Sequence, residues 1–215
     1  MTRGRFITFE GGEGAGKSTQ VRHLAQSLAS AGIESVATRE PGGSPGAEDI
    51  RKLLVEGDVQ RWDALTEALL HSAARRDHVA NMIRPALDSG KWVISDRFAD
   101  STLAYQGFGL GLSAEIIAAI TRLAVGEFSP DLTLVLDLPV EEGLKRAHRR
   151  GGSAQRYEKM DGGFHERMRQ GFIEIANAHP ERCVLIDATM PEDDVALEVR
   201  DAVASRLGVK FPGMR

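Results

Sequence analysis

The sequence has little cysteine and no long apolar run. Its single cysteine, Cys183, cannot form an internal disulfide, and one thiol cannot build a zinc site by itself. Because Cys183 begins the apolar run 183–186, we predict that it is a buried strand residue. No apolar stretch approaches the length that spans a bilayer, and the apolar run near the N-terminus is too short for a signal peptide. We therefore expect a cytoplasmic protein that does not bind membranes.

The sequence also lacks an excess of basic residues. Its 27 Lys and Arg against 31 Asp and Glu give a formal net charge of −4. Proteins whose main partner is a nucleic acid polymer usually carry a basic surface that neutralises phosphates, so this balance argues against such a partner. A small anionic ligand in a local basic pocket remains compatible with it. The length, the 42% hydrophobic content and the absence of repeats or linkers predict one domain over residues 1–215.

What the sequence does contain is a phosphate-binding motif near its start. Residues 11–18 read GGEGAGKS and match G-x-x-x-x-G-K-[ST] at every fixed position, after an apolar run at 6–9. The glycines let backbone N–H groups face phosphate oxygens, and the following helix points its positive end at the same anion. Lys17 adds a positive charge, and the Ser18 hydroxyl suits Mg²⁺. The motif predicts a site for a nucleoside triphosphate.

Hydrophobic periodicity predicts strands that alternate with helices. Strand patterns cover residues 6–9, 33–38, 92–96, 132–138 and 183–187, and helical patterns cover 21–28, 48–55, 64–87, 116–125 and 195–203. This alternation implies right-handed crossovers and an α/β fold of the phosphate-loop kinase type, with a five-stranded parallel sheet and helices on both faces. Ligands then bind outside the carboxyl ends of the strands, where the turn-rich loop 39–43 also lies.

Asp96 ends the predicted strand 92–96. A carboxylate in this position beside a phosphate loop can orient Mg²⁺ or its water ligands. The alternative is an aspartate that caps the next turn. Arg97 follows where motor-type ATPases often place a glutamate that activates water. The pattern thus favours phosphoryl transfer to a second substrate over hydrolysis.

An arginine-rich segment at residues 145–163 is predicted to form a small lid. It contains Arg146, Arg149, Arg150 and Arg156, interrupted by Gly151 and Gly152. Phosphoryl transfer spreads negative charge over oxygens, and arginines that close over it stabilise the transition state. The alternative is a solvated helix face with ordinary ion pairs.

Five ordered motifs carry a family resemblance that covers nearly the whole chain. They are FEG followed by the phosphate loop at 9–19, TREPGG at 38–43, DRF at 96–98, STLAYQ at 101–106 and IDAT at 186–189. Together they resemble bacterial thymidylate kinase. The resemblance implies transfer of the γ-phosphoryl group of ATP-Mg²⁺ to thymidine 5′-monophosphate (dTMP), with dTDP and ADP as products. It also implies a homodimer.

Carried over by position, the resemblance implies three groups of site residues. The catalytic residues are Lys17, Asp96, Arg97, Arg150 and Arg156, and the ATP site is formed by Gly11, Gly12, Glu13, Gly14, Ala15, Gly16, Lys17, Ser18 and Thr19. The dTMP site is formed by Glu13, Arg39, Pro41, Arg51, His71, Arg75, Arg97, Ser101, Thr102 and Tyr105. Ser18 and Asp96 hold Mg²⁺, in part through water.

The implied roles within the dTMP site differ. Glu13 meets the deoxyribose 3′-hydroxyl and Arg97, and Arg51 joins Arg97 on the acceptor phosphate. Arg75 hydrogen-bonds the thymine edge, which Ser101 and Thr102 approach. Tyr105 crowds the 2′ position against ribonucleotides.

Two positions depart from the usual family pattern. His71 stands where relatives often place a phenylalanine that stacks on thymine; an imidazole can also stack, but it can titrate, and the alternative is a helix residue that faces elsewhere. Gly14 stands where some relatives carry an arginine in the phosphate loop. The missing charge must then come from the lid, with Arg150 and Arg156 as the leading candidates.

Other functions are left open by the residues alone. The nearest rival is a kinase for another nucleoside monophosphate or for a nucleoside. A GTPase switch would read guanine through N-K-x-D, but Asn81 and Asn177 precede Met82 and Ala178, and no D-x-x-G is present. A nucleotide-binding module without phosphoryl transfer is the third alternative.

Overall fold

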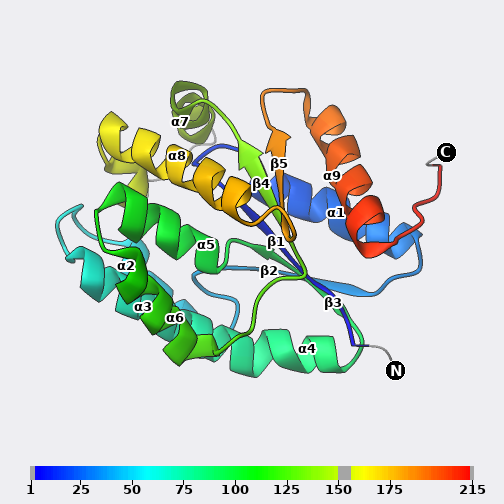
Figure 1. Cartoon of the computed structure of the whole chain (residues 1–215), viewed down its shortest axis with the longest axis horizontal. Coiled ribbons are helices and arrows are strands. Elements are labelled where there is room, and N and C mark those ends of the chain that lie inside the picture. Colours follow the sequence, from blue (N-terminus) through cyan, green and yellow to red (C-terminus); the bar gives the residue numbers. More distant parts are fainter. Residues whose placement is uncertain (1–2, 150–155, 214–215) are drawn as a thin grey trace.

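The computed structural model describes residues 3–149 and 156–213, and it has a five-stranded sheet at its centre (Figure 1). The strand order is β2-β3-β1-β4-β5, and all four strand pairings are parallel. The strands are β1 (Phe6–Gly11), β2 (Ser35–Arg39), β3 (Trp92–Asp96), β4 (Leu132–Asp137) and β5 (Cys183–Asp187). This confirms the predicted α/β fold and its parallel sheet.

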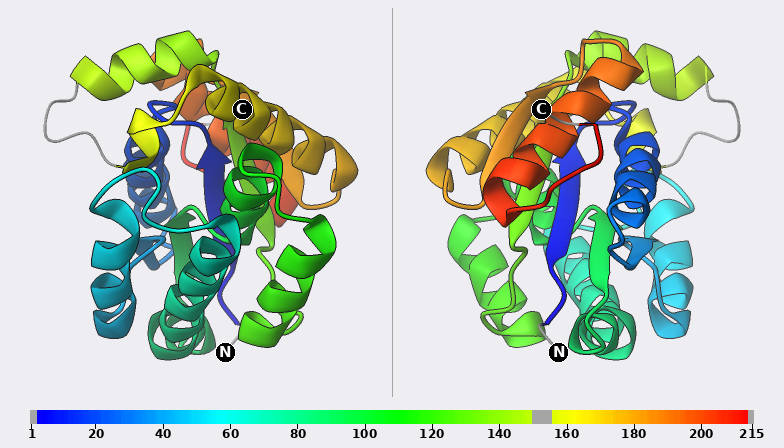
Figure 2. Two further views of the ribbon diagram at one scale, coloured as in Figure 1. Left: turned by 90° about the vertical axis from the view of Figure 1, so that its left-hand side faces the viewer. Right: turned by 90° about the vertical axis from the view of Figure 1, so that its right-hand side faces the viewer.

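Helices cover both faces of this sheet (Figures 1 and 2). They are α1 (Lys17–Ser30), α2 (Pro45–Val55), α3 (Ala64–His78), α4 (Arg84–Asp88), α5 (Ala99–Thr102), α6 (Ala114–Val125), α7 (Val140–Arg149), α8 (Gly162–Ala178) and α9 (Glu192–Leu207). Two π-helical segments, η1 (Val79–Ile83) and η2 (Leu103–Gly109), and one 3₁₀ turn, η3 (Arg156–Lys159), complete the described elements.

The alternation of side chains along β1 shows how the two faces are built. Ile7 and Phe9 point to one face, where they join the core formed with α1 and α9. Phe6 points to the opposite face and packs with η1 and α4, while Val135 of β4 packs against α8 on that same side. Both faces are buried, so β1 carries a continuous run of buried residues. Cys183 is also buried, in β5, as predicted.

Several element boundaries differ from the sequence-based prediction. β2 begins at Ser35 and extends to Arg39, and α2 begins at Pro45, because proline is well suited to the first turn of a helix. The helix predicted over 64–87 is interrupted by the π-helical η1 before it continues as α4. α6 starts two residues earlier than predicted, at Ala114, after the cap Ser113. β4 ends at Asp137, one residue early.

The segment predicted as a lid, 145–163, is partly helical. α7 extends to Arg149, η3 begins at Arg156, and α8 begins at Gly162 after its cap Asp161, whose side chain accepts a hydrogen bond from the Phe164 N–H. Residues 150–155, which include Arg150, lie outside the described residues. The helical character of α5, η2 and α8 was not predicted.

No helix within residues 3–149 and 156–213 is long and apolar enough to cross a lipid bilayer.

Two glycines bring the phosphate loop against α7. Gly14, at φ +69°, would place a Cβ atom in collision with the Gly143 carbonyl oxygen, and Gly143 would place one in collision with the Glu13 carbonyl oxygen. Only glycine permits this close approach of two backbones at both positions. The loop is therefore held between β1 and α7.

We predict that Gly143→Ala destabilises the protein by about 1–3 kcal/mol, because its Cβ overpacks the backbone of the phosphate loop. Alanine is otherwise favoured over glycine inside a helix. The matched control is Gly162→Ala in α8, where a Cβ would meet no atom within 4 Å. Urea unfolding measures both free energies of unfolding. Equal stability of the two variants would contradict the close approach.

Candidate active site

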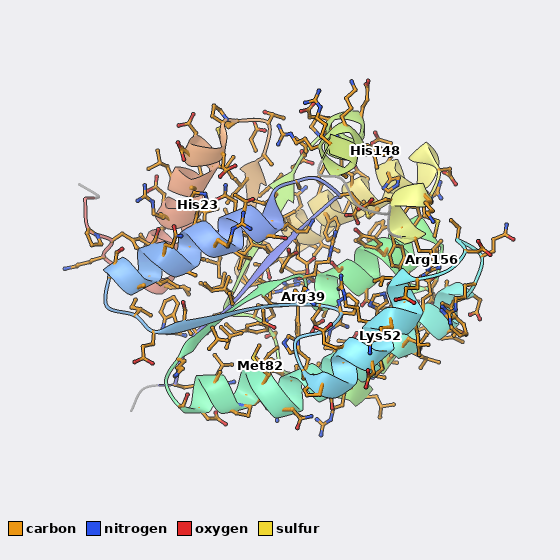
Figure 3. All side chains as sticks on the ribbon, turned by 180° about the vertical axis from the view of Figure 1, so that it is seen from behind. His23, Arg39, Lys52, Met82, His148 and Arg156 are labelled. Carbon is orange, nitrogen blue, oxygen red and sulfur yellow. The ribbon has the colours of Figure 1, made fainter. Side chains whose placement is uncertain are left out.

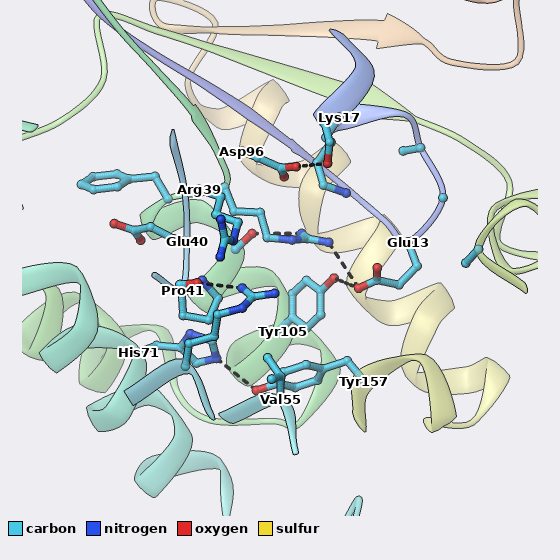
Figure 4. Close-up of a pocket in the computed structure, with 18 of the residues that line it drawn as sticks. Glu13, Lys17, Arg39, Glu40, Pro41, Val55, His71, Asp96, Tyr105 and Tyr157 are labelled. Carbon is cyan, nitrogen blue, oxygen red and sulfur yellow. Dashed lines mark hydrogen bonds and ion pairs between the residues drawn. The ribbon is translucent and has the colours of Figure 1, made fainter. Parts of the chain in front are cut away.

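A cavity of about 550 Å³ opens at the carboxyl ends of β1, β2 and β3 (Figure 4). It is lined by the phosphate loop, by the loop that follows β2, and by residues of α3, α5 and η2. Its volume falls in the range of small-molecule sites. The cavity therefore lies where a doubly wound sheet is expected to bind a ligand.

Most of the predicted site residues line this one cavity. They are Glu13, Gly14, Ala15, Gly16, Lys17, Ser18, Thr19, Arg39, Pro41, Arg51, His71, Arg75, Asp96, Arg97, Ser101, Thr102 and Tyr105. Gly11 and Gly12 form the start of the loop but are not among the lining residues, and Arg156 is not among them either. The structure thus brings together residues that are up to 92 positions apart, such as Glu13 and Tyr105.

The phosphate loop directs Lys17 and Ser18 into the cavity. The Lys17 ammonium donates to the carbonyl oxygens of Gly11, at 3.1 Å, and Gly12, at 2.7 Å. Burial and the nearby Arg97 lower the pKa of Lys17 to about 8, against the opposing effect of Asp96 and Glu13. A bound polyphosphate would supply the negative charge that favours the ammonium form.

Ser18 and Asp96 form the candidate Mg²⁺ position. The Ser18 hydroxyl donates to a carboxylate oxygen of Asp96 over 2.5 Å, so a hydroxyl and a carboxylate face the same point beside the loop. In the part of the chain that the structure describes, no group of three or more His, Cys, Asp or Glu could hold a metal ion. Oxygen ligands of this kind fit Mg²⁺, which usually takes one or two protein ligands together with substrate phosphates and water.

Arg97 links the phosphate loop to the other side of the cavity. Its backbone has φ 76°, which is uncommon for a residue other than glycine, and its side chain donates to the Gly11 carbonyl and the Ser101 hydroxyl. It also pairs with Glu13 at 3.3 Å, and Tyr105 donates to the same Glu13 oxygen at 2.7 Å (Figure 4). Burial opposes ionisation of Glu13, but Arg97, Lys17 and Tyr105 outweigh it and lower its pKa to about 2.

Glu10 supports this arrangement from below the cavity and was not predicted as a site residue from the sequence. Its buried carboxyl group accepts hydrogen bonds from the Phe98 N–H at 2.8 Å and from the Ser101 hydroxyl at 2.5 Å. Burial and the nearby Asp100 raise its pKa to about 8. Glu10 therefore holds Phe98 and Ser101, the segment that directly follows Arg97. A charged residue within an otherwise apolar strand was the signal that could have identified it.

Arg75 is buried on the inner face of α3. Its guanidinium donates to Glu40 at 2.8 Å, and to the Phe98 carbonyl and the Thr102 hydroxyl at 3.0 Å each. Its remaining nitrogen, Nη1, is buried and has no hydrogen-bond partner among the described residues. Since an unpaired buried donor is costly, this atom calls for a ligand acceptor.

Gln106 has the complementary atom, a hydrogen-bond acceptor, and was not predicted as a site residue from the sequence. Its side chain is fully buried and lines the cavity, and its Nε2 donates to Glu67 at 2.8 Å. Its Oε1 has no partner within the described residues. Among the described residues that line the cavity, Arg75 thus has an unpartnered buried donor and Gln106 an unpartnered buried acceptor. The sequence signal was the position of Gln106 at the end of the STLAYQ motif.

The remaining acceptor-site candidates lie around the same cavity. Arg51 donates to the Pro41 carbonyl at 2.7 Å, and Arg39 pairs with Glu48 at 3.0 Å. His71 hydrogen-bonds the Tyr157 hydroxyl at 3.0 Å (Figure 4). Arg39 and Arg51 thus add positive charge to the rim that Arg97 already lines.

Arg156 is not brought to the phosphate loop, contrary to its predicted role in a lid. Its guanidinium is fully buried, pairs with Glu67 at 2.5 Å and donates to the carbonyl oxygens of Leu54 and Val59 at 3.0 Å each. Figure 3 labels Arg156 where η3 lies beside α2. Arg146, by contrast, lines the cavity and donates to the Ala188 carbonyl. Arg156 is thus enclosed by the fold, whereas Arg146 faces the site.

Comparisons with known proteins agree with this geometry. The sequence pattern of a family described as Thymidylate kinase matches residues 9–199. The thymidylate kinase of Caulobacter vibrioides is 56% identical over 209 residues, which cover 97% of this chain and 100% of the relative. That of a Bradyrhizobium species is 55% identical and covers 95% of this chain and 92% of the relative.

A solved structure shows the same similarity in three dimensions. The crystal structure of thymidylate kinase from Ehrlichia chaffeensis superimposes with a TM-score of 0.75 at 37% identity, over 94% of this chain and 99% of that one. The phosphate loop, the arginine-lined cavity and these full-length similarities agree, and the chain belongs to the thymidylate kinase family, whose reaction is the phosphorylation of dTMP to dTDP.

Proposed function

We propose that this chain transfers the γ-phosphoryl group of Mg²⁺-ATP to dTMP, for dTTP synthesis, and that a single domain carries both sites. The observation that carries the choice of base is the pair of unpartnered atoms, Nη1 of Arg75 and Oε1 of Gln106. Thymine offers a carbonyl acceptor, O4, next to a donor, N3–H. Cytosine offers a donor and an acceptor at the same positions, so this pair of protein atoms selects thymine or uracil over cytosine.

On the donor side, Lys17 and the amides of the phosphate loop hold the β- and γ-phosphates of ATP. Ser18 and Asp96 would hold Mg²⁺, Asp96 in part through water, and the ion supplies positive charge between the phosphate oxygens. The hydrogen bonds that Lys17 makes to Gly11 and Gly12 keep its ammonium above the loop, where a phosphate can replace them.

On the acceptor side, Arg97 with Arg51 and Arg39 binds the phosphate of dTMP. Glu13 accepts from the deoxyribose 3′-hydroxyl while it orients Arg97, and Tyr105 crowds the 2′ position through its hydrogen bond to Glu13. Because the attacking group is already a phosphate oxygen, no general base is needed. Transfer proceeds in line, without a covalent enzyme intermediate.

The lid supplies positive charge in the transition state. Arg146 supports this proposal because it lines the cavity from α7. The proposed catalytic role of Arg150 rests on the sequence, because Arg150 lies outside the described residues. The buried position of Arg156 supports a different role, developed in the next subsection.

We also propose that the chain forms a homodimer through α3 and α6. Leu65 and Leu69 on α3, and Ile116 and Leu123 on α6, are large apolar side chains with 42%, 50%, 42% and 88% exposure. The two helices pack side by side, so these residues can form one self-complementary patch. Light scattering tests this proposal. The proposal requires that the Leu123→Glu protein has a lower molar mass in solution than the parent protein, because a charge in the patch would separate the dimer.

We predict that Lys17→Ala lowers kcat by at least about 10²-fold without loss of fold, because it removes charge from the transferring phosphate. The thermal midpoint should stay close to that of the parent protein, since the hydrogen bonds of the Lys17 side chain within the described residues go to two loop carbonyls. Lys52→Ala, at an exposed lysine of α2, is the matched control and should keep full turnover. Normal turnover of Lys17→Ala would overturn the donor-site assignment.

The direct test of the function is ADP formation from ATP-Mg²⁺ across a panel of nucleoside monophosphates, with a reaction without acceptor as control. We expect strong turnover with dTMP and little with dCMP. ADP formation that is independent of the acceptor would refute the proposal.

We predict that Gln106→Met lowers kcat/KM for dTMP by about 10-fold or more, because it removes the acceptor for N3–H.

A further inference from the structure

A buried polar cluster lies beneath the base-binding end of the cavity. We define the Glu67 cluster as Glu67 of α3, Gln106 of η2, Arg156 and Tyr157 of η3, and the adjoining His71. Glu67, Gln106 and Arg156 are all 0% exposed. Most buried polar side-chain atoms have a hydrogen-bond partner, so the charge of one member of the cluster constrains the proton positions of its neighbours.

The starting point is the ion pair between Arg156 and Glu67. Arginine remains protonated in proteins, and its Nη2 lies 2.5 Å from Oε1 of Glu67. The pair makes Glu67 a carboxylate, which can only accept hydrogen bonds. Its second oxygen, Oε2, accepts from Gln106 Nε2 at 2.8 Å and from the Tyr157 hydroxyl at 2.9 Å.

The first consequence concerns Gln106. A carboxylate cannot donate to an amide oxygen, so Gln106 must turn its NH₂ group toward Glu67. Its Oε1 is then the atom left without a partner, in a residue that lines the cavity. The direction of the amide is therefore dictated by the charge of Glu67 and not by the base.

The second consequence concerns His71. The Tyr157 hydroxyl donates its one hydrogen bond to Glu67. Burial together with Glu67 raises the pKa of Tyr157, so the hydroxyl stays protonated. The Tyr157 oxygen also accepts a hydrogen bond from Gln106 Nε2 at 3.4 Å. Toward the His71 ring nitrogen Nε2, which lies 3.0 Å away, Tyr157 can then act only as an acceptor (Figure 4). His71 must carry its proton on Nε2 and leave Nδ1 as an acceptor.

His71 is also surrounded by positive charge. Burial, and then Arg75, Arg156, Arg97 and Arg51, lower its pKa to about 3, so the ring is neutral at neutral pH. A neutral ring with one fixed proton is a defined surface for a base. The same ring in its charged form would donate from both nitrogens.

We infer that Glu67, held as a carboxylate by Arg156, is a specificity-determining positioning residue that fixes the hydrogen-bond polarity of the base pocket through Gln106 and His71. The inference deepens the proposed function and rests on the proposed placement of the base against Arg75 and Gln106. The inference gives Arg156 a role in the selection of the acceptor nucleotide, although Arg156 does not line the cavity. If the ion pair between Arg156 and Glu67 only stabilised the fold, its loss would change kcat/KM equally for all acceptor nucleotides.

The first test is Glu67→Gln. A neutral glutamine at this position can donate to Gln106 Oε1, which frees Gln106 to turn its NH₂ group toward the base. We expect the ratio of kcat/KM for dTMP to that for dCMP to fall by at least about 10-fold, with part of the change arising from a gain with dCMP. Glu198→Gln, at an exposed glutamate of α9, is the matched control and should leave the ratio unchanged. An unchanged ratio in a folded Glu67→Gln protein would overturn the inference.

The second test needs neither turnover nor a folded Glu67 variant. ¹⁵N NMR of the imidazole rings in the parent protein, without ligand, should show His71 protonated on Nε2 and unprotonated on Nδ1 at pH 6 to 8. In Tyr157→Phe this preference should be lost. A proton on Nδ1, or a doubly protonated ring at pH 6, would overturn the inference while leaving the assignment of the reaction intact. Failure of the acceptor panel would instead refute the proposed function and leave this NMR result standing.

Discussion

Buried charges must be paired, and this requirement organises the polar side of the cavity. Arg97 pairs with Glu13, Arg75 with Glu40, and Arg156 with Glu67. Each pair orients further groups, so the ligand-facing atoms are in place before a substrate arrives. Pre-oriented groups of this kind bind with less loss of conformational entropy than mobile ones. The cost is that the removal of one partner leaves the other buried and unpaired.

The pairing also explains why Arg75 and Gln106, among the described residues that line the cavity, each keep one polar atom without a partner. Arg75 uses its Nε and one terminal nitrogen on the protein, and Gln106 uses its NH₂ group on Glu67, which leaves Nη1 and Oε1 for a ligand. Both residues lie on helical segments that pack against each other through α3 and η2. A site on such elements holds its geometry better than a site on loops. The proposed selection of thymine therefore rests on the fold and not on a single residue.

Local sequence patterns predicted the features that are set by local physics. The phosphate loop needs glycines at fixed spacings, and the strands and their carboxyl ends follow from apolar runs that end at turns, so Lys17, Ser18 and Asp96 could be placed from the sequence. Partners distant in sequence could not. Arg156 stands in a segment rich in arginine and glycine that resembles a lid, yet its partner is Glu67, 89 positions earlier, and the sequence does not show that pairing. Glu10 and Gln106 each carried a local signal, but their partners Phe98 and Glu67 are also distant in sequence.

The central claim is that Arg75 and Gln106 read the two adjacent polar atoms of thymine. A crystal structure of the protein with dTMP tests it most directly. We predict that Arg75 Nη1 lies within 3.2 Å of O4 and that the Gln106 side-chain oxygen lies within 3.2 Å of N3, a hydrogen-bond distance in both cases. A thymine ring bound elsewhere in the cavity, with both atoms still unpartnered, would contradict the account.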